Sequence, residues 1–165
     1  MKIAILSDIH DNIWNLKKVL KEIKDEKIDA IIFCGDFCAP FTFKRLAEVG
    51  IQTYAVFGNV DGAQQEITDE AFKNHKHITL KKELLEIELG GRKIAICHSD
   101  QFADSLALTG KYDVVFHGHT HHPRVEKVGK TILANPGEVH GGLKGKCTFG
   151  IYDTEKNEIV IKEVE

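Results

Sequence analysis

The sequence lacks a long apolar run and an evident signal peptide. No stretch of the 165 residues approaches the roughly 18–20 apolar residues that a membrane-spanning helix needs. The first apolar segment, Met1–Ser7, is short and leads directly into Asp8 and His10, unlike the longer apolar region of a secretory signal. We therefore expect no membrane association and a cytoplasmic protein.

An excess of positive charge is also absent, and cysteine is scarce. The formal net charge is −3, so no overall positive field would attract nucleic acid, and we expect binding to no nucleic acid beyond nucleotides. The four cysteines lie mostly in apolar segments, which is typical of buried thiols in a reducing compartment. Cys34 and Cys38 could form half of a zinc site, but no second cysteine pair accompanies them.

Short apolar runs rich in Ile, Val and Phe recur along the chain. Continuous runs of this kind are typical of strands buried on both faces. Five of them end at polar or glycine residues; they are Lys2–Leu6, Ala30–Cys34, Thr53–Phe57, Lys93–Cys97 and Asp113–Phe116. Because ligands of α/β sheets lie beyond the carboxyl ends of strands, we expect the polar residues after these runs to meet at one site.

Helical periodicity separates several of these strands. Apolar residues recur at helical spacing in Asn12–Glu26, where Asp11 or Asn12 is the expected N-cap. Further helices are predicted at Phe41–Val49 after Pro40, at Ala63–Asn74 and near Gln101–Thr109. We expect one domain over residues 1–165.

The second half is dominated by strands. Turns are predicted at Gly90-Gly91 and Gly129-Lys130. Further strand-like segments are His77–Leu80, Glu83–Gly90, Arg124–Val128, Lys130–Asn135, Cys147–Asp153 and Glu158–Val164. These strands are more than a single sheet usually holds. The sequence therefore predicts an α/β (α+β) fold with two stacked sheets and helices outside.

The polar residues at the strand ends form a mixed nitrogen and oxygen donor set. They are Asp8, His10, Asp36, Asn59, His98, His119 and His121. Such donors suit divalent Mn, Fe, Co, Ni or Zn, and seven are too many for one tetrahedral ion. They suit two ions that share a bridging carboxylate and bind a phosphoryl group. Taken singly, each residue could be an ordinary turn or core residue; the whole set in order argues for a site.

The order of these motifs resembles that of the calcineurin-like metallophosphoesterases, over nearly the whole chain. The motifs here are Asp8-Ile9-His10, Gly35-Asp36, Gly58-Asn59, His98 and Gly118-His119-Thr120-His121. The resemblance looks closest to the small single-domain phosphodiesterases of bacteria and archaea, which are related to a eukaryotic scaffold subunit of a sorting complex. It implies a four-layer αββα sandwich.

The resemblance also implies roles for the individual residues. Asp8, His10 and His121 would bind one metal, Asn59, His98 and His119 the second, and Asp36 would bridge them. Asp36, Asn59 and His98 would be the catalytic residues. A hydroxide held between two divalent ions, Mn or Ni first and Fe, Co, Zn or Mg as alternatives, would attack a small phosphodiester.

One position departs from the family pattern. Many relatives carry a histidine after the Gly-Asn pair as a proton donor to the leaving group, and here Val60 occupies it. A general acid contributes about 10²- to 10⁴-fold in rate, so we predict diesterase activity on good leaving groups and little monoesterase activity. Asp61 and His122 are candidate substitutes, and Asn12, at a predicted helix start, is a candidate phosphate contact.

Other residues have ordinary interpretations. His75 and His77 read as surface or strand-edge residues, and His117 as a packing residue or one that orients a ligand. His140 could border the pocket, although exposure to solvent is the favoured interpretation. Trp14 reads as a helix-packing residue in preference to a platform for a nucleobase. A phosphomonoesterase, a nuclease of the same fold and a weakly active binding scaffold remain alternatives, and a homodimer is the default assembly.

Overall fold

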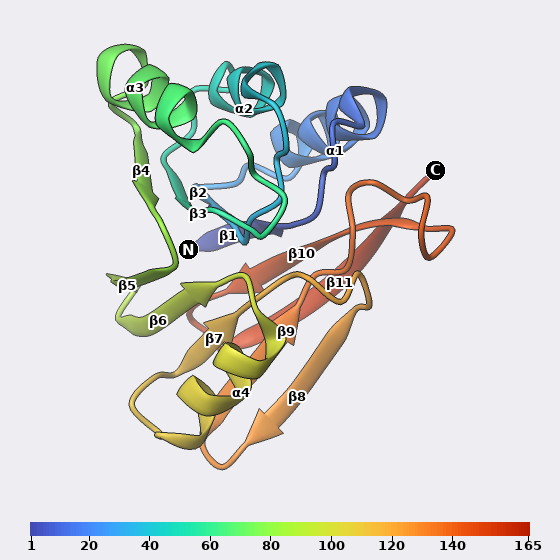
Figure 1. Ribbon diagram of the computed structural model, residues 1–165. Helices are drawn as coiled ribbons and strands as arrows, with labels where there is room; N and C mark the ends of the chain where they lie inside the picture. The colour runs from blue at the N-terminus through green and yellow to red at the C-terminus, as the bar shows by residue number, and fades with distance from the viewer.

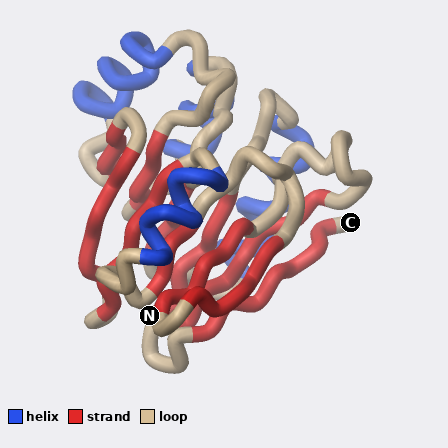
Figure 2. The backbone as a smooth tube through the Cα atoms, turned by 60° about the horizontal axis from the view of Figure 1, so that its bottom comes forward, coloured by secondary structure: helices blue, strands red, loops and turns tan.

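A computed structural model describes all residues, 1–165, and arranges them as two sheets with helices on the outer faces (Figure 1). Helices α1 (Ile13–Asp25), α2 (Pro40–Ala47) and α3 (Gln64–Asn74) cover one sheet, and α4 (Asp100–Leu108) packs against the other. The predicted four-layer αββα sandwich is confirmed, and Figure 2 shows the strands of the two sheets from another side.

The first sheet has six strands in the order β11-β10-β1-β2-β3-β4. Their bounds are β1 (Lys2–Leu6), β2 (Ala30–Phe33), β3 (Thr53–Val56), β4 (Ile78–Lys81), β10 (Cys147–Asp153) and β11 (Glu158–Val164). Strands β1 to β4 are parallel, with Ile5 opposite Ile32 and Ile32 opposite Tyr54. The parallel register brings the carboxyl ends of β1, β2 and β3 to one edge.

The second sheet has five strands in the order β5-β6-β7-β9-β8. Their bounds are β5 (Leu84–Leu89), β6 (Arg92–Cys97), β7 (Val114–Phe116), β8 (Arg124–Val128) and β9 (Thr131–Asn135). Strands β6, β7 and β9 are parallel, whereas β5 and β8 pair antiparallel with their neighbours. The predicted hairpin turns at Gly90-Gly91 and Gly129-Lys130 are confirmed, because they join β5 to β6 and β8 to β9.

The four predicted helices are present, with ends that differ by a residue or two. Asn12 caps α1, since its Oδ1 accepts a hydrogen bond from the amide of Asn15 at 3.1 Å. Ser99 caps α4 in the same way through the amide of Phe102. Pro40 occupies the first turn of α2, where its missing N–H removes no helical hydrogen bond.

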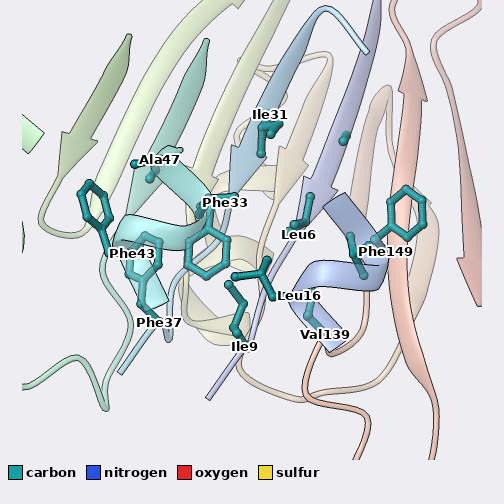
Figure 3. Packing of buried hydrophobic residues seen from close by; sticks show 14 of the residues in the cluster. Leu6, Ile9, Leu16, Ile31, Phe33, Phe37, Phe43, Ala47, Val139 and Phe149 are labelled. Atoms are coloured by element: carbon teal, nitrogen blue, oxygen red, sulfur yellow. The ribbon is translucent and has the colours of Figure 1, made fainter. Parts of the chain in front are cut away.

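The hydrophobic core has three layers, because both sheets are buried on two faces. In β1, Ala4 and Leu6 face the helices, while Ile3 and Ile5 face the second sheet. Figure 3 shows the helix-side layer, which includes the stacked rings of Phe33 and Phe37 at a centroid distance of 4.0 Å. Each fully buried side chain of this size contributes about 1.5–3 kcal/mol, which explains the continuous apolar runs.

Two observations concern the surface. No helix combines the length and the apolar character needed to traverse a bilayer.

The interpretation of Trp14 as a packing residue is wrong: it lies on the outer face of α1 with 73% of its surface exposed. The buried positions of α1 are instead Leu16, Val19 and Ile23, so Trp14 lies outside the apolar stripe that faces the sheet.

Candidate metal centre

The predicted ligands lie in loops that leave the carboxyl ends of strands in both sheets. Five of them adopt positive φ: Asp8 (55°), His10 (44°), Asp36 (66°), His119 (71°) and His121 (61°). This region is uncommon for residues other than glycine, although Asp and His adopt it more readily than most, and each such residue costs up to the order of 1–3 kcal/mol. The loops from the first sheet hold each other through backbone hydrogen bonds of 3.0 Å from the amides of Asp8 and Ile9 to the carbonyls of Gly35 and Asp36.

Asp8, His10 and His121 form one group of potential ligands. Asp8 Oδ1 lies 3.6 Å from His10 Nε2 and 3.4 Å from His121 Nε2. The two imidazole rings stack with their centroids 4.9 Å apart. The β1 exit supplies Asp8 and His10, and the loop after β7 supplies His121, so this group joins the two sheets.

A second group consists of Asp8, Asp36 and His98. Asp36 Oδ2 lies 3.2 Å from His98 Nε2 and 3.5 Å from His10 Nε2. The two groups share Asp8, whereas the family resemblance implies Asp36 as the bridge. Asp36 faces nitrogen donors of both groups, so its position also suits a shared ligand.

Asn59 and His119 complete the cluster. Asn59 Oδ1 lies 2.9 Å from His98 Nε2 and 2.9 Å from His119 Nδ1. His119 also donates its backbone N–H to Asp8 Oδ2 at 3.2 Å. The structure therefore brings all seven residues together at one edge of the molecule, from loops after five strands.

The cluster lacks internal partners for two buried atoms, Asp8 Oδ1 and His10 Nε2, neither of which makes a hydrogen bond. An unpaired buried acceptor is costly, and a divalent cation would satisfy the carboxylate oxygen and the imidazole nitrogen together. These borderline nitrogen and oxygen donors suit such an ion. The donor set thus fits the divalent metals that the sequence predicts.

Charges within the cluster shift its titration. The nearby Asp8 carboxylate, 3.6 Å from Nε2, raises the pKa of His10 above its ordinary value. Burial works against protonation of His98, but the neighbouring Asp36 carboxylate raises its pKa overall. Burial also opposes ionisation of Asp36, yet hydrogen bonding and charge from His98 lower its pKa. The field of the two carboxylates thus favours positive charge at the site.

Glu138 is a site residue that the sequence analysis missed. Its side chain is fully buried, and its Oε2 lies 2.6 Å from His121 Nδ1. Its Oε1 accepts hydrogen bonds from the amides of Leu143 and Lys144 at 3.0 and 2.7 Å. A carboxylate on Nδ1 leaves Nε2 free to bind a metal. The available signal was a sixth strand end, where β9 runs into Asn135-Pro-Gly-Glu138.

Asp61 has a scaffolding position and is not free to act as a proton donor. Its carboxylate accepts hydrogen bonds from the amides of Asp36, Cys38 and Gly58 at 3.0, 2.7 and 2.7 Å. Burial raises its pKa, and these three amide donors oppose that shift. Asp61 therefore holds the loop that carries Asp36 against the loop that carries Asn59.

The remaining residues singled out from the sequence lie around the cluster. Val60 is 44% exposed, and its amide donates to Asp36 Oδ1 at 3.1 Å. His117 is buried behind the ligands, as predicted, with Nδ1 3.0 Å from the carbonyl oxygen of Gly118. His140 is half-buried, and its ring meets that of His10 edge-on at 5.8 Å, so it borders the site.

Asn12 lies at this rim as well. Its Oδ1 caps α1, and its Nδ2 donates to the carbonyl oxygen of His140 at 2.8 Å. Both side-chain polar atoms thus have partners within the protein, and a phosphate contact stays a prediction.

Comparison with known proteins decides the family. The profile of the calcineurin-like phosphoesterase superfamily domain matches residues 1–157. The chain belongs to this superfamily. It is therefore a hydrolase of the phosphoric-ester class, and the predicted resemblance is confirmed.

Individual relatives support the assignment over nearly the full length. A phosphodiesterase of Methanocaldococcus jannaschii is 36% identical over 160 residues, which cover 96% of each chain. A solved archaeal phosphodiesterase superposes with a TM-score of 0.92 at 33% identity, covering 99% of this chain and 100% of that one. Vacuolar protein sorting 29 of Cryptosporidium parvum shares the fold, with a TM-score of 0.70 at 17% identity over 98% and 95% of the two chains.

Proposed function

We propose that this phosphoesterase is a divalent-metal-dependent phosphodiesterase that hydrolyses small diesters at a dinuclear site. The observation that carries the proposal is the gathering of seven nitrogen and oxygen donors in one cluster, in which two buried atoms, Asp8 Oδ1 and His10 Nε2, have no hydrogen-bond partner. The 36% identical relative, named as a phosphodiesterase, supports the diester over the monoester.

Each side chain then has a defined part. Asp8, His10 and His121 would hold one ion, Asn59, His98 and His119 would hold the second, and Asp36 would contact both. Two bound divalent ions would supply positive charge and lower the pKa of a water molecule. Because Asp8 and Asp36 contribute −2 against +4 for two ions, the ligand set would keep a charge of +2, or +1 with a bound hydroxide. The Glu138 carboxylate behind His121 lowers each figure by one, which leaves a site that attracts an anionic ester best before the hydroxide forms.

The protein's own groups orient these donors and the substrate. Glu138, 2.6 Å from His121 Nδ1, directs Nε2 of that imidazole toward the site. Asn12 and the first turn of α1 lie at the rim, where helix N–H groups favour a phosphate. The N–H groups of Asn12, Ile13 and Asn15 already donate within the protein. The role we propose for Asn12 is therefore to hold the start of α1, whose dipole would attract the ester, next to the ligands.

Val60 determines which esters react well. Its apolar side chain is partly exposed beside Asn59 and donates no proton to a leaving group. Aryl and other leaving groups of low pKa need this proton least, so diesters of that kind should be the best substrates. Replacing Val60→His should raise alkyl phosphomonoester hydrolysis about 10²-fold or more, measured beside aryl diester hydrolysis; unchanged monoesterase activity would contradict this account of Val60.

The cellular setting and assembly are also part of the proposal. All four cysteines are free thiols, which supports a reducing compartment such as the cytoplasm. A homodimer remains the proposed assembly.

The decisive experiment is an assay of the purified chain with a bis-aryl phosphate. Chelation should abolish turnover, and Mn²⁺ or Ni²⁺ should restore it, with two ions bound per chain by elemental analysis. Metal binding without turnover on any diester would favour a scaffold over an enzyme. Saturation at one ion per chain would overturn the dinuclear site.

A further inference from the structure

An open groove of about 930 Å³ lies between α1 and α2, outside the metal centre. Its apolar floor includes Ile13, Leu20 and Val49. Its walls carry five cationic side chains and one carboxylate, that of Glu48. Arg45 already pairs with Glu48 at 2.9 Å, so the remaining cations give the groove a positive potential, although the whole chain has a net charge of −3.

Three lysines of α1 lie in a row along one face of the helix, and the exposed Trp14 lies at the start of this row. Trp14, Lys17, Lys21 and Lys24 line the groove at spacings of three, four and three residues, which place them on one helix face. The lysines succeed one another about every 5.4 Å, one helical turn. No ion pair or side-chain hydrogen bond involves Lys17, Lys21 or Lys24, in contrast to Lys2, Lys111 and Lys162.

One end of the groove, at Ile13 and Trp14, directly follows the rim of the metal centre in the chain. Asn12 caps α1 two residues before Trp14 and donates to the carbonyl of His140, which borders the site. The start of α2 is tied to the same loop, since the amide of Ala39 donates to Asp11 Oδ1 at 2.9 Å. The two helices lie side by side over the first sheet (Figure 1), and the groove starts at Ile13 and Trp14, directly after Asn12 in the chain, and extends along α1 and the second half of α2.

We infer that this groove binds a single-stranded oligonucleotide whose scissile phosphodiester enters the metal centre. A cationic path combined with an exposed aromatic ring is the combination that holds single strands without sequence preference. Trp14, nearest the site, would stack on a base, and the ammonium groups of Lys17, Lys21 and Lys24 would pair with successive phosphates. The inference rests on the proposed function, because the strand supplies the bond that the site would hydrolyse.

Charge and bond type favour this ligand over an acidic peptide. Both would satisfy the lysines, but only a nucleotide strand presents a phosphodiester to the adjoining site and a planar base to Trp14. Glu22 and Asp25 of α1 do not line the groove, but each follows a groove lysine by one helical turn, so they offset part of the positive charge there. The groove is thus locally cationic, although the whole chain carries a net negative charge of −3.

The test compares two charge-reversal variants that change the net charge equally. Lys17→Glu with Lys21→Glu alters the groove, and Lys127→Glu with Lys130→Glu alters the exposed β8–β9 hairpin. Binding of a fluorescent twelve-nucleotide thymidylate strand is measured by anisotropy at several salt concentrations. Hydrolysis of that strand and of a bis-aryl phosphate is measured with Mn²⁺-loaded protein.

The groove variant should bind the strand at least about tenfold more weakly, with a log–log salt slope smaller by about 1.4 for two lost phosphate contacts. Trp14→Ala should weaken binding about tenfold, the range expected for one stacked base. Hydrolysis of the small diester should stay within about twofold of the wild type in all variants, and the hairpin variant should bind the strand normally.

Three outcomes would overturn the inference. They are equal losses in the groove and hairpin variants, no strand binding by the wild type at low salt, and displacement of the strand by polyglutamate as readily as by unlabelled oligonucleotide. Turnover of the small diester in any of these cases would leave the proposed function standing. Strand binding through the groove with no turnover of any diester would remove the proposed function and, with it, the entry of a scissile bond into the metal centre, and would leave the groove as a binding surface only.

Discussion

Individual residues at the centre hold conformations and charges that would be unfavourable elsewhere. Five ligand candidates have positive φ, and Asp8 is a fully buried carboxylate whose Oδ1 has no hydrogen-bond partner. Residual strain and unpaired polar atoms of this kind concentrate at functional sites.

Glu138 provides the test at this scale. Glu138→Ala should weaken divalent metal binding about 10- to 100-fold, the usual effect of removing a partner of a ligating histidine. It should also loosen the segment around Leu143 and Lys144, whose amides lose their acceptor. Glu138→Gln keeps an oxygen acceptor and should lose less affinity. Titration calorimetry with Mn²⁺ measures the metal affinity of each variant in its metal-free form. Wild-type affinity in Glu138→Ala and in Glu138→Gln would contradict the role assigned to Glu138.

At the scale of elements, the loops after β2 and β3 approach so closely that side chains are excluded. A Cβ atom on Gly58 would lie 2.0 Å from Asp36 Oδ1 and 2.6 Å from its backbone nitrogen. A Cβ atom on Gly35 would lie 2.7 Å from His98 Nδ1. Asp61 joins the two loops from inside through three amide hydrogen bonds. The glycines of the Gly-Asp and Gly-Asn motifs therefore allow the contact that places Asp36 beside Asn59.

Two glycines of the same loop allow a matched comparison. Gly58→Ala should destabilise the fold by about 1–3 kcal/mol through overpacking and lower metal affinity, since Asp36 must move. Gly62→Ala introduces a Cβ into open space and should change neither. Urea unfolding and metal titration of both variants provide the measurement. Equal behaviour of the two variants would show that the close approach is not required.

For the whole molecule, the centre lies where the carboxyl ends of both sheets meet. Asp8, Asp36 and Asn59 follow strands of the first sheet, while His98, His119 and His121 follow strands of the second. Bound metal would therefore connect the two sheets beyond the apolar layer that already joins them. Metal binding should for this reason stabilise the whole fold.

Metal removal tests this connection. Mn²⁺ at about 100 times its dissociation constant should stabilise the native state by about 2.7 kcal/mol per site. For a chain of this size, that raises Tm by about 5–10 °C. Calorimetry of chelator-treated protein with and without Mn²⁺ measures the shift, and Asp8→Asn should reduce it. An unchanged Tm at saturating Mn²⁺ would mean that the ion does not bind the folded site.

Local pattern was sufficient to predict the layers and the gathering of the seven candidate ligands at one edge. Runs such as Lys2–Leu6 encode strands buried on both faces, and residues at strand ends share one edge wherever the strands are parallel, so seven donors were predictable before any coordinates. The clamp formed by Asp61 and the cationic groove beside Trp14 were not predictable, and for Glu138 the sequence offered only its position after a strand end, without its partner His121. Each depends on distances between segments remote in the chain, as in the 17-residue separation of Glu138 from His121. Only the packing of one sheet against the other, and of α1 against α2, decides which of these side chains meet and which face the solvent.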